Sequence, residues 1–227
     1  MPSTLLTSRD SRLPDALLER LRRVTGDEKH DSAAHSTLDV LWVLHDRVLD
    51  SPGGDRFLLS KGHGPASYYA VLAALGLIPD SWLDDLGGID SPLGHHPDRL
   101  LIPPVEISSG SLGHGLPIAV GLARGLEIAG EAGRIFVLVG DAELDEGSNH
   151  EAIAVAARWS LGRLHCIVID NASASLGWTG GIASRFAVEG WATADVDTAD
   201  HDGLAAALSA RGPEPRVTVV HTPAKGA

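Results

Sequence analysis

The sequence predicts an α/β fold with a mainly parallel sheet and helices on both faces. Short apolar runs at 135–139 and 166–169 indicate strands that are buried on both faces, as in parallel sheets. Between them, residues 149–159 carry apolar side chains at mostly helical spacing. The three segments therefore form a βαβ unit, whose right-handed crossover makes the second strand parallel to the first. The 227 residues, 44% of them hydrophobic, suit one domain with a sizeable core, residues 1–227.

The remaining elements follow from apolar spacing along the chain. Residues 1–12 are expected to form a flexible N-terminus. Ser36 followed by Asp39 has the pattern of a capped helix start, after a polar turn at 29–35. Further helices are predicted at 14–24, 65–77, within 79–90, and at 116–128, 182–190 and 201–210, and further strands at 190–197 and 216–221.

The composition bears on partners and on location. A formal net charge of −12 at pH 7 disfavours binding to nucleic acids and to anionic membranes. The single cysteine, Cys166, lies in a predicted buried strand, where we expect an inert core thiol. One cysteine allows no disulfide within the chain, and we find no apolar leader and no run long enough to span a bilayer. We therefore expect a cytoplasmic protein.

Two side chains mark a candidate binding edge. Asp141 follows the first apolar strand, and Asn171 follows the second. Because the strands are parallel, both residues leave the same edge of the sheet, where ligands of open α/β folds bind. A carboxylate and an amide oxygen form a hard-oxygen site that suits Mg²⁺, with waters and phosphate oxygens completing the coordination. The stretch therefore predicts a metal and a phosphorylated ligand at this edge.

The same stretch resembles a known motif. G-D-A-E-L-D-E-G, followed thirty positions after its aspartate by asparagine, resembles the thiamine-diphosphate motif of the transketolase family, with Ala142 at the second glycine. The resemblance implies a thiamine-diphosphate-binding fold of the diphosphate-binding type, with thiamine diphosphate and Mg²⁺ as cofactors. It implies that Asp141, Asn171 and the Ser173 carbonyl hold the metal. It also implies that Gly140, Ala142 and Asn171 contact the cofactor.

Two further segments carry the resemblance to the cofactor site. L-S-K-G-H-G, which contains His63, resembles the family's L-S-x-G-H segment and implies that His63 contacts the diphosphate and takes part in catalysis. S-G-S-L-G-H-G resembles T-G-S-L-G-Q-G, with His114 in place of glutamine. It implies that the Gly110 and Leu112 backbone lies along the two rings of the cofactor. From the residues alone, His63 can also cap a helix, and the second segment can be a plain glycine-rich loop.

The resemblance also implies substrate-side residues. L-G-H-H-P-D resembles the family's L-x-G-H-P-D/E loop and gives His96, while K-H-D-S-A-A-H-S resembles G-H-x-G-G-S-x-S and gives His30. Both histidines are then expected to hydrogen-bond substrate hydroxyls. Glu146 is expected to couple two cofactor sites across a subunit interface. Adjacent histidines in a polar loop, and a glutamate in the first turn of a helix, are also ordinary surface features.

The similarity extends from about His30 to Ala227 and covers only the diphosphate-binding half of a transketolase. The pyrimidine-binding domain and a further substrate-side histidine segment have no counterpart in this sequence. The resemblance therefore implies the N-terminal subunit of a split transketolase that works with a C-terminal transketolase-like subunit, in an α₂β₂ assembly. The implied reaction transfers a two-carbon ketol unit from a ketose donor to an aldehyde acceptor, with a sugar or small carbonyl compound as substrate.

Three alternatives stay open at this point. The chain can be the alpha-type subunit of a 2-oxo-acid decarboxylase or dehydrogenase, or a two-carbon transferase of specialised metabolism. The candidate histidines His63 and His96, with the S-G-S-L-G turn, favour sugar chemistry over the first of these. The chain can also be a non-catalytic partner subunit, which the presence of both Asp141 and Asn171 argues against.

Overall fold

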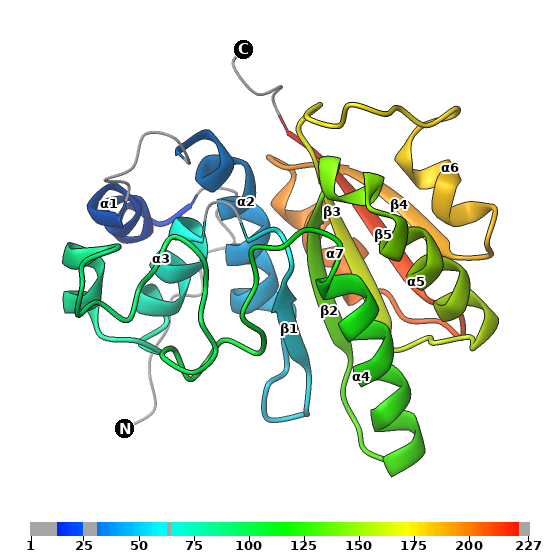
Figure 1. The fold of residues 1–227 in the computed structure, drawn as a ribbon, viewed down its shortest axis with the longest axis horizontal. Coiled ribbons are helices and arrows are strands. Elements are labelled where there is room, and N and C mark those ends of the chain that lie inside the picture. The colour runs from blue at the N-terminus through cyan, green and yellow to red at the C-terminus, as the bar shows by residue number, and fades with distance from the viewer. Residues whose placement is uncertain (1–12, 25–30, 63–64, 223–227) are drawn as a thin grey trace.

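The computed structural model describes residues 13–24, 31–62 and 65–222, and for 31–36 the backbone only. The expected flexible N-terminus lies outside these residues, as do His30 and His63. Five described strands form one parallel sheet in the order β1-β2-β3-β5-β4 (Figure 1). Their bounds are Arg56–Leu59 for β1, Ile135–Gly140 for β2, Leu164–Asp170 for β3, Ala192–Asp197 for β4 and Arg216–His221 for β5. The predicted α/β fold with a parallel sheet is confirmed.

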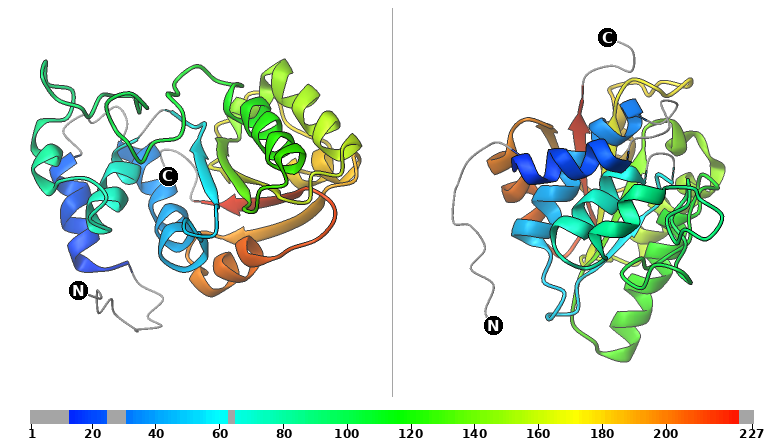
Figure 2. Two further views of the ribbon diagram at one scale, coloured as in Figure 1. Left: turned by 90° about the horizontal axis from the view of Figure 1, so that it is seen from below. Right: turned by 90° about the vertical axis from the view of Figure 1, so that its left-hand side faces the viewer.

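Helices cover both faces of the sheet. The helices α4, α5 and α6 lie over one face, and α2 and α7 over the other, with α1 and α3 packed outside β1 (Figures 1 and 2). Their bounds are Asp15–Val24 for α1, Asp31–Val43 for α2, Ala66–Ala74 for α3, Gly115–Ala129 for α4, Gly147–Arg158 for α5, Ile182–Ala187 for α6 and His201–Ser209 for α7.

The central strand β2 shows why the sheet is buried on both faces. Successive side chains of a strand point to opposite faces, so its apolar run supplies both cores. Ile135, Val137 and Val139 pack under α4 and α5, while Phe136 and Leu138 pack toward α2 and α3. All six residues of β2 are buried, which matches the continuous apolar sequence that predicted it. At the sheet edge, β4 alternates between half-buried and exposed positions instead.

Two local predictions need correction, and one strand was missed. The helix expected to start at Ser36 begins at Asp31, so part of the predicted turn is helical. An acid in the first turn and two alanines after it favour this earlier start. The helix continues as a π-helical turn, Leu44–Val48. The short helix expected within 79–90 is a 3₁₀ turn at Asp80–Asp85, and β1 was not predicted.

A buried ion pair joins the amino ends of β1 and β2. Asp55 accepts the Arg134 N–H at 2.7 Å, and its other oxygen accepts the Arg134 guanidinium at 2.6 Å. Burial favours the neutral form of Asp55, but the hydrogen bonds from Arg134 outweigh it and hold the pKa of that carboxyl below its ordinary value. The guanidinium also donates to the Val48 and Leu208 carbonyls, which ties α2 and α7 to the sheet.

The carboxyl ends of the strands define one edge, opposite this ion pair. From this edge leave the loops that begin at Ser60 after β1, at Asp141 after β2 and at Asn171 after β3. None of the helices in the described parts of the chain is both long enough and apolar enough to cross a bilayer.

Candidate functional site

The Asp141 carboxylate is 3% exposed and lies where β2 ends. Its Oδ1 accepts hydrogen bonds from the Ala142 N–H at 2.8 Å and from the Ser173 hydroxyl at 2.5 Å. Its Oδ2 accepts the N–H groups of Ser173 at 2.6 Å and Ala174 at 3.0 Å. Asp141 and Ser173 therefore lie together, and Ala142, which is expected to contact the cofactor, donates its N–H to Asp141.

Asn171 follows β3 at the same edge and is 6% exposed. Its side-chain oxygen Oδ1 is buried and accepts no hydrogen bond from any residue that the structure describes. Leaving such an acceptor unsatisfied costs about 1–3 kcal/mol, so each case needs a physical reason. The next residue, Ala172, has φ +56°, a left-handed conformation that is uncommon outside glycine and turns the loop sharply.

The oxygens at this edge fit a hard cation. A carboxylate and an orphaned amide oxygen are the ligand types that Mg²⁺ takes, usually with few protein ligands. A cation would satisfy the lone pairs of Asn171 Oδ1, which no group of the described chain does. The four hydrogen bonds on Asp141 match the number of its lone-pair sites, so a metal on this carboxylate displaces at least one of them.

Three loop segments, at Gly62, His96 and Gly110, approach one another closely. A side chain on Gly62 would place its Cβ 2.5 Å from the Gly110 nitrogen, and one on Gly110 would place its Cβ 2.7 Å from His96 Cδ2. Gly110 also has φ +142°, which only glycine adopts without strain. We call the place where Gly62, His96 and Gly110 come together the cradle. The side chain of Lys61 runs alongside Gly140, at the end of β2.

Glu143 is a site residue that the sequence analysis missed. It is 1% exposed, and its Oε1 accepts a short hydrogen bond from the Ser60 hydroxyl and the Gly113 N–H at 3.0 Å. Its Oε2 accepts the Gly140 N–H at 3.3 Å. Burial raises the pKa of this carboxyl, and the same hydrogen bonds with the nearby Lys61 charge oppose the rise. The sequence offered one sign that Glu143 could be buried: it lies between two apolar residues, Ala142 and Leu144.

Glu146 lies at the start of α5 and is exposed. A side chain on Gly113, which has φ +81°, would place its Cβ 2.7 Å from Glu146 Cβ. The Ser148 hydroxyl donates to the Gly113 carbonyl at 2.6 Å. The loop that carries Gly110 and Leu112 is therefore held against the first turn of α5.

The loop after β3 is anchored at a second point. The Ser175 hydroxyl and the Leu176 N–H both donate to Asp145 Oδ2 at 3.3 Å. Further on, the Trp178 ring lies 5.1 Å from the His150 ring. The Arg185 guanidinium lies 5.3 Å from the centre of the same indole. The loop thus lies over the segment between β2 and α5, and none of these anchors was predicted.

The structure brings several of the predicted residues together. Asp141 is hydrogen-bonded to Ser173, Asn171 follows β3 at the same edge of the sheet, and the imidazole of His96 lies against Gly110. The two predicted histidines in undescribed segments have no position here. The roles assigned to all these residues stay predictions.

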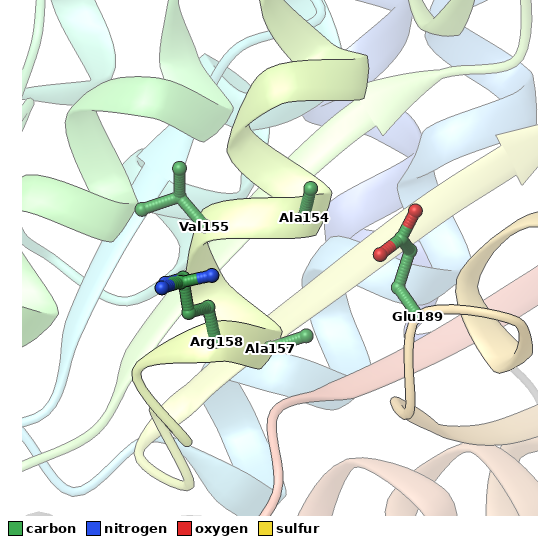
Figure 3. A pocket seen from close by; sticks show the side chains of 5 residues that line it. All are labelled: Ala154, Val155, Ala157, Arg158 and Glu189. Atoms are coloured by element: carbon green, nitrogen blue, oxygen red, sulfur yellow. The ribbon is translucent and has the colours of Figure 1, made fainter.

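A separate hollow lies at the far end of α5 from Glu146. It has a volume of about 360 Å³ and lies between the carboxyl-terminal half of α5 and Glu189, in the turn that follows α6 (Figure 3). Its lining consists of Ala154, Val155, Ala157, Arg158 and Glu189. None of these residues belongs to the site at the strand ends.

Known proteins resemble the chain in sequence and in fold. Residues 28–222 match the family model described as "Transketolase, thiamine diphosphate binding domain". The relative named "Ferredoxin fas2" from Rhodococcoides fascians is 54% identical over 202 residues, which is 86% of this chain and 66% of that protein. One subunit of the apulose-4-phosphate transketolase of Actinobacillus succinogenes is 42% identical over 157 residues, which is 66% of this chain and 57% of that protein.

A solved structure gives the same picture of the fold. The transketolase from Campylobacter jejuni superposes with a TM-score of 0.74 over 93% of this chain and 38% of that one, at 21% identity. The chain thus spans 66% or less of the length of each of these three proteins. With the family model covering residues 28–222, the chain belongs to the transketolase family, of which it contains the thiamine diphosphate binding domain.

Proposed function

We propose that this chain is the N-terminal subunit of a two-component transketolase that depends on thiamine diphosphate and Mg²⁺. The reaction is transfer of a two-carbon ketol unit from a ketose donor to an aldehyde acceptor. The observation that carries the proposal is the pair of oxygens at the ends of β2 and β3. The Asp141 carboxylate is buried there, and Asn171 Oδ1 is buried with no partner among the described residues.

The cofactor needs residues that hold its diphosphate through a metal. Asp141, Asn171 and the Ser173 carbonyl would supply three oxygens to Mg²⁺, whose charge offsets that of the diphosphate. When bound, thiamine diphosphate supplies the electron sink that stabilises the negative charge on the transferred unit. The protein supplies binding, orientation and electrostatics around it.

Other residues of the chain would orient the reactants. The Lys61 ammonium, beside the end of β2, is a candidate for the diphosphate charge. His96 lies against the Gly110 backbone, at the loop tips, where it would donate to or accept from a substrate hydroxyl. Glu146 is exposed at the start of α5, which suits a contact with a neighbouring subunit.

The proposed enzyme also needs a second polypeptide. The Actinobacillus relative is named as one subunit of a transketolase, and this chain covers 57% of it. We infer that a second polypeptide brings the pyrimidine-binding domain and that the complex is α₂β₂. The substrate is then a sugar or a small carbonyl compound, as in the transketolase reaction.

The name of the Rhodococcoides relative suggests electron transfer, which this chain does not support. Iron–sulfur clusters of ferredoxins are held by four cysteine thiolates, and this sequence has one cysteine. That cysteine, Cys166, is buried in β3. A non-catalytic role has less support than catalysis, because a chain that binds no cofactor has no physical need for an unsatisfied oxygen at Asn171.

Calorimetric titration with thiamine diphosphate in excess Mg²⁺ tests the proposal. The chain alone and the chain with its co-purified partner are titrated, together with Asp141→Ala and the control Asp15→Ala at the exposed start of α1. We expect tight binding only in the complex, retained by the control and lost in Asp141→Ala. Failure of the verified complex to bind would refute the cofactor assignment.

A further inference from the structure

Glu143 connects the segments that surround the proposed cofactor site. Its carboxylate accepts the Ser60 hydroxyl after β1, the Gly113 N–H before α4 and the Gly140 N–H at the end of β2. Its backbone carbonyl accepts the Asn149 side-chain amide of α5 at 2.6 Å. One residue therefore joins the ends of β1 and β2 and the starts of α4 and α5, and two of these contacts span 30 and 83 positions of the sequence.

Ser60 extends this network to the start of α4. Its hydroxyl donates to Glu143 and accepts the Gly115 N–H at 3.0 Å. Gly115 has no room for a side chain, because its Cβ would overlap the Ser60 Cβ. Ser60 and Glu143 are both 1% exposed, so water does not compete for these hydrogen bonds.

Two of the three groups that donate to the Glu143 carboxylate are glycine N–H groups, those of Gly113 and Gly140. Gly113 has φ +81°, and glycine at such a position loses more freedom on ordering than any other residue. A charged acceptor makes stronger hydrogen bonds than a neutral one and fixes the N–H groups that point at it. A buried carboxylate is costly to keep, and here its contacts fix two loops and the end of β2.

We propose that Glu143 is a positioning residue for thiamine diphosphate. It would act by holding the loops at Ser60 and Gly113, and the end of β2 at Gly140, in their binding geometry. This inference rests on the proposed function and adds a residue that touches neither the metal nor the substrate. Removal of Glu143 then weakens cofactor binding by loosening the loops. Groups that orient metal ligands typically change affinity by about 10–100-fold when removed, and we expect an effect of the same order for a residue that orients the surrounding loops.

Cofactor affinity of the complex with its partner polypeptide tests the inference. Glu143→Ala is expected to raise the Kd for thiamine diphosphate in excess Mg²⁺ by about 10–100-fold, with kcat at saturating cofactor changed less than about threefold. Glu143→Gln is expected to restore much of the affinity, because its one oxygen can still accept from Ser60 and Gly113. Ser60→Ala is expected to shift the Kd in the same direction and supplies the test if Glu143→Ala does not fold.

The matched control is Asp55→Asn, which alters a buried carboxylate at the opposite ends of β1 and β2. It is expected to lower the melting temperature and leave the Kd unchanged. Amide exchange adds a readout that needs no cofactor: the Gly113 and Gly140 N–H groups are expected to exchange faster in Glu143→Ala than in the control.

The outcomes separate this inference from the proposed function. If the wild-type complex does not bind thiamine diphosphate, the proposed function fails. If the wild-type complex binds and the Glu143 and Ser60 variants bind equally well, the positioning role fails alone. The positioning role also fails if Asp55→Asn raises the Kd as much as Glu143→Ala at an equal loss of melting temperature.

Discussion

Replacing Asn171 with alanine should change stability in opposite directions without and with cofactor. In the chain without metal, Asn171 Oδ1 is buried and has no partner among the described residues. An unsatisfied buried acceptor costs about 1–3 kcal/mol, and Asn171→Ala removes that cost at the loss of a few side-chain contacts. We therefore expect Asn171→Ala to raise the free energy of unfolding by about 1 kcal/mol.

With cofactor bound, we expect wild type to be more stable than Asn171→Ala. A ligand at 100 times its Kd stabilises the folded state by about 2.7 kcal/mol. The wild-type complex gains this with Mg²⁺ and thiamine diphosphate, while Asn171→Ala gains little because a metal ligand is gone. At about 2–4 °C per kcal/mol for a chain of this size, the variant melts about 2–4 °C above wild type without cofactor and several degrees below it with cofactor.

Thermal unfolding of both proteins, with and without Mg²⁺ and thiamine diphosphate, measures this crossing. Asn171→Asp is the matched variant: it keeps a metal ligand but adds a second buried carboxylate beside Asp141, so it should lose stability without Mg²⁺ and regain it with Mg²⁺. If Asn171→Ala melts lower than wild type without cofactor and keeps the stabilisation by cofactor, Asn171 is not a metal ligand.

Further predictions concern the loops, the core and the thiol. Gly110→Ala should weaken cofactor binding at least tenfold and lower the melting temperature, because φ is +142° and the new Cβ meets the His96 ring. If calorimetry gives this variant the same cofactor affinity as wild type, the close approach of these loops does not form the cofactor site. Burial lowers the pKa of His165 to about 3, so the unfolded chain binds a proton that the folded one does not as pH falls below about 6.5. Stability should fall there by up to about 1.4 kcal/mol per pH unit, and less steeply in His165→Gln; equal slopes in urea denaturation would oppose this. Burial also raises the pKa of the Cys166 thiol, so a thiol reagent should react with it only after unfolding, and rapid reaction of the native chain would show that β3 opens.

The sequence allowed the central sheet and most helices to be predicted, for identifiable reasons. The β2 and β3 runs are continuous and apolar because both faces of these strands are buried. The helix α4 is long and bounded by Gly115 and Gly130, and α5 begins at Gly147. The strand β1 has four residues and is followed by polar Ser60, so length and pattern gave no signal. Its assignment depends on pairing with β2, which lies about eighty positions later.

In the candidate site, too, some features could be predicted from the sequence and others could not. The parallel βαβ rule brings Asp141 and Asn171 to one edge without any knowledge of side-chain contacts. The contact between Ser60 and Glu143 joins residues 83 positions apart, and no local pattern indicates it. The Trp178 anchor of the loop after β3 depends on side chains from two helices and was equally hidden.

Two buried polar groups at this edge differ in how they are satisfied, and the difference separates positioning from binding. The Glu143 carboxylate takes three hydrogen bonds from the chain itself, so it has little left to offer a ligand and instead fixes the loops around it. Asn171 Oδ1 takes none from the described residues, so its burial costs free energy until a cation or another donor satisfies it. A group of the first kind should control how well the site is formed, and a group of the second kind should control whether it is filled. Calorimetry on variants of the two should therefore separate weakened affinity at Glu143 from lost metal dependence at Asn171.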